Sequence, residues 1–132
     1  MTNPLSFSID DEALVAFTRD LVRSRSWNPP GDEAEVAQLV VERLEDFGLD
    51  VETDPVAPGR PNVYGRLRGK GDGPGQLLLV SHLDTVPPAG GGWEHDPLSG
   101  VVTDGRVYGR GTADMKGGLA ALVFAAGALA RS

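Results

Sequence analysis

The chain has 132 residues, of which 40% are hydrophobic and 23% are charged. This length accommodates one domain with a core of its own and is too short for two ordinary domains. The composition is that of a globular protein rather than a disordered or fibrous one. The net charge is −7 and no cluster of Lys and Arg is present, which argues against a nucleic-acid partner. The absence of cysteine excludes disulfides, thiolate zinc sites and a cysteine nucleophile.

The first ten residues and the last apolar stretch indicate the expected cellular location of the protein. Met1–Asp10 has neither the basic region nor the apolar core of a secretory signal. Gly117–Ala130, the longest uncharged apolar stretch, would be about 21 Å long as a helix. Spanning a bilayer takes about 20 residues. We therefore expect a buried helix, no membrane partner and a cytoplasmic protein.

Residues 10–24 have the pattern of an amphipathic helix. Asp10 can cap its N-terminus, and apolar residues recur at three- and four-residue spacing. The segment 27–31, which contains two prolines and a glycine, then interrupts the chain. A second helix is expected from Asp32, where Asp32 and Glu35 form a capping-box-like pair, to a stop at Gly48.

Several segments between the helices predict strands. Leu49–Thr53 and Asn62–Leu67 alternate in part, and residues 101–109 resemble a hairpin that turns at Asp104-Gly105. Gln76–Val80 is apolar without alternation, which is typical of a strand buried on both faces of a parallel or mixed sheet. The fold class expected is therefore α/β, with a mixed β-sheet flanked by helices.

Polar residues follow this expected buried strand directly. His82 and Asp84 stand at its carboxyl end, where open α/β sheets bind their ligands. An imidazole that binds a metal through one nitrogen needs an acceptor for its other N–H, and a carboxylate two residues along can supply it. A His-x-Asp pair alone is also compatible with a polar residue at a strand end that binds nothing.

A glycine-rich loop, residues 109–118, holds Asp114 just before the last helix. Asp114 could cap that helix, or it could be a metal ligand. A phosphate-binding loop is a further alternative, but the glycine spacing matches neither the dinucleotide fingerprint nor the P-loop.

Three features occur together in this order: Ser-His-Leu-Asp-Thr-Val-Pro at 81–87, Trp93 with Pro97, and Gly-Arg-Gly-Thr-Ala-Asp-Met-Lys-Gly-Gly at 109–118. Their combination resembles the zinc-dependent deacylase and exopeptidase family of acetylornithine deacetylase, succinyl-diaminopimelate desuccinylase, aminoacylase and the related carboxypeptidases. The similarity runs from about Leu14 to the C-terminus. The related zinc aminopeptidases also use a His-x-Asp pair, but the second loop favours the deacylase branch.

The resemblance implies a function and roles for three residues. His82 would bind one metal of a pair, Asp84 would be the catalytic aspartate that orients His82, and Asp114 would bridge both metals. The cofactor implied is two Zn²⁺ ions, although Co²⁺ or Mn²⁺ suits the same ligands. The reaction implied is hydrolysis of the amide bond of an N-acyl amino acid or a small peptide.

The same resemblance implies that the site is incomplete. A catalytic zinc usually has three protein ligands, and the family's general base and remaining ligands lie beyond the position of Ser132. We expect residues 1–132 to be the N-terminal portion of the catalytic domain, without the lid domain through which a homodimer could form. The alternative is a catalytically incompetent fragment or a metal-binding module.

Overall fold

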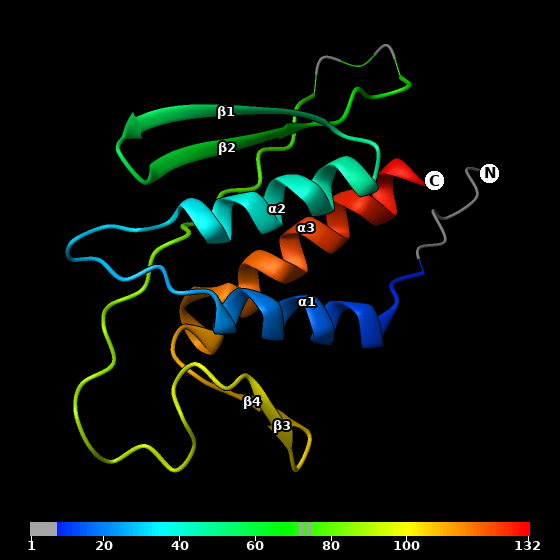
Figure 1. The fold of residues 1–132 in the computed structure, drawn as a ribbon. Helices are drawn as coiled ribbons and strands as arrows, with labels where there is room; N and C mark the ends of the chain where they lie inside the picture. Colours follow the sequence, from blue (N-terminus) through cyan, green and yellow to red (C-terminus); the bar gives the residue numbers. More distant parts are fainter. Residues whose placement is uncertain (1–7, 72, 74) are drawn as a thin grey trace.

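The structure is a computed structural model that describes residues 8–71, 73 and 75–132. Three helices form its centre, and two β-hairpins lie on opposite sides of them (Figure 1). The α3 helix runs between α1 and α2, and the first hairpin lies over α2. The expected α/β class is confirmed.

The first helix, α1 (Asp11–Arg23), forms where its apolar periodicity predicts it. Asp10 caps it as expected, since its carboxylate accepts a hydrogen bond of 2.9 Å from the backbone N–H of Ala13. Phe17 and Leu21 are buried on the side that faces the other helices. The cap and the apolar stripe therefore fix both the start and the orientation of α1.

The second helix, α2 (Ala34–Asp46), differs from the prediction at its start. Asp32 does not cap it; the N-cap residue is Glu33, which makes no side-chain capping bond. The Asp32 carboxylate instead accepts a 3.0 Å hydrogen bond from Arg25, a longer-range partner that the local pattern could not reveal. The C-terminal stop is confirmed, because Gly48 follows with a φ of +81° that glycine adopts readily.

The last helix, α3 (Gly117–Ala130), supplies the middle of the core. Phe124 is 2% exposed, and its ring centroid lies 5.9 Å from that of Phe17 in α1 and 5.1 Å from that of Phe47 after α2. The expected buried helix is thus confirmed. The buried core comprises Phe17, Leu21, Val36, Val40, Leu44, Leu49, Leu119, Ala120, Val123 and Phe124.

Hydropathy gives one further observation about α3. Within the part of the chain that the structure describes, Thr112–Ala130 is the one helical stretch whose length and composition would suffice to cross a membrane. The core helix of a globular protein passes the same test. Here α3 packs against α1 and α2 (Figure 1).

The strands form two separate antiparallel hairpins. Strand β1 (Asp50–Ala57) pairs with β2 (Arg60–Arg66), and β3 (Val101–Thr103) pairs with β4 (Arg106–Tyr108). The second hairpin turns at Asp104-Gly105 as predicted. The strands were expected in one mixed sheet, whereas the two hairpins do not pair with each other among the described residues.

The prediction of a buried strand at Gln76–Val80 is wrong. The segment has no regular secondary structure, and Leu77, Leu78 and Val80 are 76%, 83% and 71% exposed. A strand buried on both faces needs neighbouring strands and covering helices, and no strand pairs with this segment in the described part of the chain. A cavity of about 630 Å³ separates it from β2.

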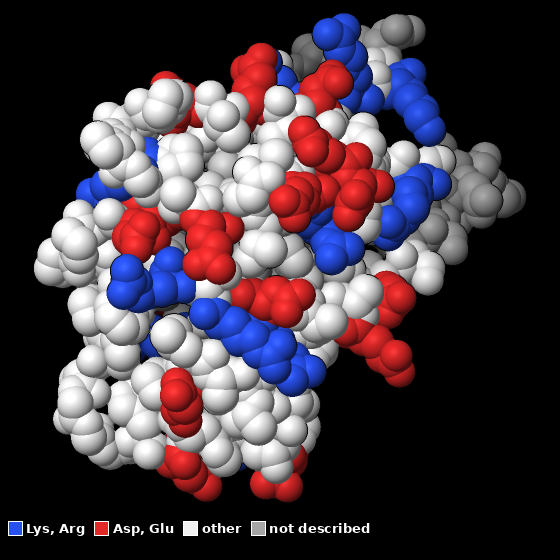
Figure 2. Space-filling model, in the orientation of Figure 1, with Lys and Arg blue, Asp and Glu red and all other residues white. Residues whose placement is uncertain are grey.

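The surface charges show no large patch of one sign on the face seen in Figure 2. Acidic and basic side chains alternate there over the helices and the first hairpin. The ion pairs include Arg66 with Glu52 at 3.2 Å and Arg25 with Asp32 at 3.0 Å. Such exposed pairs contribute little to stability individually.

Candidate metal centre

The backbone around Thr85 anchors the segment that carries His82 and Asp84. The N–H of Thr85 donates to the carbonyl of Ser26 at 2.8 Å, and the Thr85 carbonyl accepts from the N–H of Asn28 at 2.8 Å. This single parallel bridge ties the segment to the loop that follows α1. Thr85 is buried, so His82 and Asp84 project from a fixed point of the backbone.

The glycine-rich loop packs against the same point through Gly111. Its φ is +84°, and a Cβ added there would lie 2.5 Å from the Cγ2 of Thr85. The Gly111 carbonyl also accepts a 2.7 Å hydrogen bond from the N–H of Lys116. Glycine is required here for its backbone conformation and for this close approach, which brings Asp114 next to the His82 segment.

The side chain of Lys116 secures the other end of the loop. It is 2% exposed, and its Nζ donates a 2.7 Å hydrogen bond to the carbonyl of Ser24, at the end of α1. Burial lowers the pKa of Lys116 to about 8, although the charge of Glu35 opposes the shift. Lys116 therefore holds the end of the loop against the end of α1.

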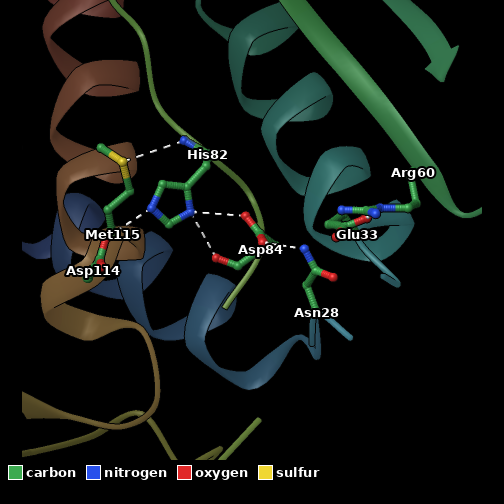
Figure 3. Close-up of polar contacts among 7 residues, drawn as sticks. All are labelled: Asn28, Glu33, Arg60, His82, Asp84, Asp114 and Met115. Carbon is green, nitrogen blue, oxygen red and sulfur yellow. Dashed lines mark hydrogen bonds and ion pairs between the residues drawn. The ribbon is translucent and has the colours of Figure 1, made fainter. Parts of the chain in front are cut away.

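The imidazole of His82 lies between two carboxylates (Figure 3). Its Nδ1 is 3.2 Å from Oδ1 of Asp84 and 3.0 Å from the Asp84 carbonyl oxygen. Its Nε2 is 2.9 Å from Oδ1 of Asp114, which comes from a loop 32 residues further along the chain. The structure thus brings together all three residues that the sequence singled out.

Asp114 does not cap α3, so that alternative is wrong. Its backbone is non-helical, with φ −135° and ψ 99°, and the N-cap position of α3 is occupied by Lys116. The Asp114 side chain is 87% exposed. Its carboxylate therefore reaches His82 from one side and remains open to solvent on the other.

Contacts within the cluster raise the pKa of His82 and lower that of Asp84. Burial by itself lowers the pKa of His82, but the hydrogen bond to Asp114 and the interactions with Asp84 outweigh it and raise that pKa above 6.5. The hydrogen bond from Asn28 is the main cause that lowers the pKa of Asp84, and His82 and Arg60 act in the same direction. Asp84 therefore favours a proton on Nδ1 and Asp114 favours one on Nε2, so the two carboxylates together stabilise the protonated ring.

Sequence reasoning missed Asn28. It stands in the segment 27–31, which the sequence marked only as a break between two helices. Its Nδ2 donates a 3.0 Å hydrogen bond to Oδ2 of Asp84 across 56 residues of chain. Neither hydrophobic periodicity nor motif spacing signals such a contact, because it depends on how two loops pack.

The residues present fit part of a metal site. The Nε2 of His82 and Oδ1 of Asp114 converge to 2.9 Å, and imidazole nitrogen with carboxylate oxygen is a donor set that zinc accepts. The described segments contain no group of three or more His, Cys, Asp or Glu side chains placed to hold an ion. The arrangement thus offers one nitrogen donor and one oxygen donor side by side, with the carboxylate of Asp84 against the other ring nitrogen.

Comparison with known proteins agrees with the resemblance seen in the sequence. Residues 78–132 match the model of peptidase family M20/M25/M40. The chain is 43% identical over 114 residues to a succinyl-diaminopimelate desuccinylase of Gluconobacter oxydans and 36% identical over 118 residues to that of Methylobacterium radiotolerans. These alignments cover 84% and 86% of the chain but 28% and 29% of the relatives.

A third relative, the succinyl-diaminopimelate desuccinylase of Gluconacetobacter diazotrophicus, is 38% identical over 120 residues, which is 89% of the chain and 29% of that protein. The fold and the paired site loops thus define a part of a peptidase-like catalytic domain. The chain belongs to peptidase family M20/M25/M40, and it spans less than a third of the length of these relatives.

Proposed function

We propose that the chain forms half of the metal centre of a hydrolase that cleaves the amide bond of N-acyl amino acids or small peptides. The observation that carries the proposal is the His82 ring, held by Asp84 at Nδ1 and directed by Nε2 at Asp114. The relatives are named for the removal of a succinyl group from succinyl-diaminopimelate, which favours an N-acyl amino acid as the substrate class.

Each residue of the cluster has a separate task in this proposal. Asp84 keeps the proton of the imidazole on Nδ1, so that the lone pair on Nε2 is free for a cation. Asp114 supplies an anionic oxygen beside that nitrogen. The other side of the Asp114 carboxylate is exposed, so its second oxygen is accessible to a second cation. Two neighbouring cations repel each other, and a carboxylate shared between them would offset that repulsion.

Zinc is the cofactor we propose, with two ions in a complete site and cobalt or manganese as substitutes. When bound, such ions polarise the scissile carbonyl and lower the pKa of a bound water towards neutrality. His82 and Asp114 would hold them on this chain. The described residues do not include a candidate for every remaining ligand.

A second candidate function is that of a metal-binding fragment without turnover. It is favoured by the two donors found within the described residues, because a catalytic zinc usually has three protein ligands and an open position. We propose accordingly that residues 1–132 are the N-terminal portion of a longer catalytic domain. A cytoplasmic location and a homodimer formed through a separate domain belong to the same proposal.

One assay distinguishes the two candidates. The chain is supplied with zinc, and hydrolysis of an N-succinyl amino acid is followed by release of the free amine, with His82→Ala and a chelator as comparisons. Turnover that both treatments abolish would rule out the incompetent fragment. If the chain binds zinc without turnover, while the chain joined to the remainder of a relative is active, 132 residues provide the half-site alone.

A further inference from the structure

The amide of Asn28 and the carboxylate of Asp84 meet at the edge of the candidate metal centre (Figure 3). Nδ2 of Asn28 donates to Oδ2 of Asp84 at 3.0 Å, while Oδ1 of the same carboxylate lies 3.2 Å from Nδ1 of His82. The two oxygens of Asp84 therefore have different partners, one on each side.

We propose that Asn28 is a positioning residue for the metal centre: it fixes the plane of the Asp84 carboxylate and thereby determines which nitrogen of His82 faces the metal. The proposal rests on the proposed function in so far as it concerns a metal. Its structural part, the orientation of the His82 ring, holds for the metal-free protein as well.

A carboxylate needs such a partner because its last torsion is soft. The terminal torsion of aspartate is broad and two-fold, so a single hydrogen bond from His82 would allow the group to turn. A second donor on the opposite oxygen removes that freedom. Outer groups that orient a metal-binding histidine in this way act on affinity without touching the ion.

Asn28 is itself well placed to serve as the fixed point. Its backbone N–H donates to the Thr85 carbonyl at 2.8 Å, one residue beyond Asp84. Pro29 and Pro30 follow it and restrict the backbone there, and the N–H of Gly31 closes the turn on the Trp27 carbonyl at 2.9 Å. The donor and the acceptor of the side-chain bond thus project from two backbone segments that are bonded to each other.

The chemistry of an amide suits this position better than that of an acid. The Nδ2 group of Asn28 is a neutral donor, so it satisfies Oδ2 and leaves the negative charge of Asp84 facing His82. An aspartate at position 28 would have the same size but would place two carboxylates against each other, which is unfavourable. The variants Asn28→Ala and Asn28→Asp therefore remove the donor in two different ways.

The first measurement is of the ¹⁵N chemical shifts of the His82 ring in the metal-free chain, at a pH where the ring is neutral. The second is of zinc affinity, by competition with a chromophoric chelator. We expect the wild type to carry its proton on Nδ1. In both Asn28 variants, the population of the His82 ring with its proton on Nε2 should increase. Zinc affinity should fall about tenfold, which is the smallest loss usual for residues that orient a metal ligand. Asn62→Ala is the matched control, because Asn62 donates to the hydroxyl of Tyr64 on the exposed hairpin.

Each outcome decides the proposal. Wild-type ring shifts in both folded variants would overturn it, as would an equal change in Asn62→Ala. If Asn28→Ala does not fold, the isosteric Asn28→Asp gives the result. If the wild type binds no zinc, the proposed function fails, but the ring shifts still show whether Asn28 orients His82 through Asp84.

Discussion

The Nδ1 atom of His82 lies 3.2 Å from Oδ1 of Asp84 and 3.0 Å from the Asp84 carbonyl. Two oxygens of one residue thus occupy one side of the imidazole, and the opposite nitrogen is left to Asp114 at 2.9 Å. Because a ring nitrogen that donates a proton cannot bind a cation, this relationship makes Nε2 the nitrogen available to a metal.

Replacing Asp84 by asparagine should reverse this preference. Asn28 is a donor, so the new amide would turn its oxygen towards Asn28 and its NH₂ group towards Nδ1 of His82. The ring would then keep its proton on Nε2. We expect the affinity for zinc to fall about 10- to 100-fold, as measured by competition with a chelator.

Asp54→Asn is the matched control for this change, since Asp54 is exposed on β1. Its zinc affinity should equal that of the wild type. Equal affinities for Asp84→Asn and the wild type would show that Asp84 does not orient His82.

Gly111→Ala should loosen the junction between the two site loops. The added methyl group would meet Cγ2 of Thr85 at 2.5 Å, at a residue whose φ is +84°. The backbone conformation costs about 1–2 kcal/mol and overpacking adds about 1–3 kcal/mol. Thermal and urea unfolding measure the sum.

Gly105→Ala separates the two contributions. Gly105 also has a positive φ, of +70°, but nothing lies within 4 Å of its added Cβ. It should show the conformational cost alone. A loss in Gly111→Ala no larger than that in Gly105→Ala would contradict the close packing of Gly111 on Thr85.

How far the sequence predicted the fold depended on whether the determining contacts were local. The helix α1 followed from apolar periodicity and α3 from an uninterrupted apolar stretch, and the Asp10 cap and the Gly48 stop followed from neighbours in the chain. The Asp32 cap failed because Arg25 competes for that carboxylate. The Gln76–Val80 strand failed because an apolar run becomes a buried strand only when other strands flank it.

The site was predictable to a similar extent. His82, Asp84 and Asp114 could be found from residue type, order and spacing, and the structure brings them together. Asn28 could not be found, since its contact with Asp84 joins two loops that are 56 residues apart. Residues that orient a site through tertiary packing leave no periodic or local signal.

Lys116 should make the stability of the protein depend on alkaline pH. Its pKa is about 8 in the folded protein, against an ordinary value of 10.5. The unfolded chain therefore binds more protons between pH 8 and 10.5, and the free energy of unfolding rises with pH across this window. The full effect is about 3 kcal/mol.

Lys116→Met should abolish this rise, whereas Lys70→Met should preserve it, because Lys70 is exposed. Urea unfolding of the three proteins at pH 8 and pH 10.5 measures the difference. If the free energy of unfolding rises equally in Lys116→Met and in the wild type between these pH values, burial does not lower the pKa of Lys116.

Phe124→Ala should be the most damaging of the simple core changes. The ring is 2% exposed and packs against the ring of Phe17 in α1 and that of Phe47 just after α2. Truncation of a buried phenylalanine costs about 3–5 kcal/mol, and urea unfolding would measure it. Val86→Ala, at a side chain that is 61% exposed, should cost far less; equal losses would mean that α3 is not the centre of the core.

In the proposed function, His82 and Asp114 together bind a metal ion. Zinc titration of the wild type and of His82→Ala, Asp114→Ala and His95→Ala, by competition with a chromophoric chelator, tests it most directly. His95 is the other of the two histidines, and its ring packs against Tyr108 at 4.8 Å. Zinc binding should be lost in His82→Ala and Asp114→Ala and retained in His95→Ala. Wild-type affinity in His82→Ala would contradict the proposed function.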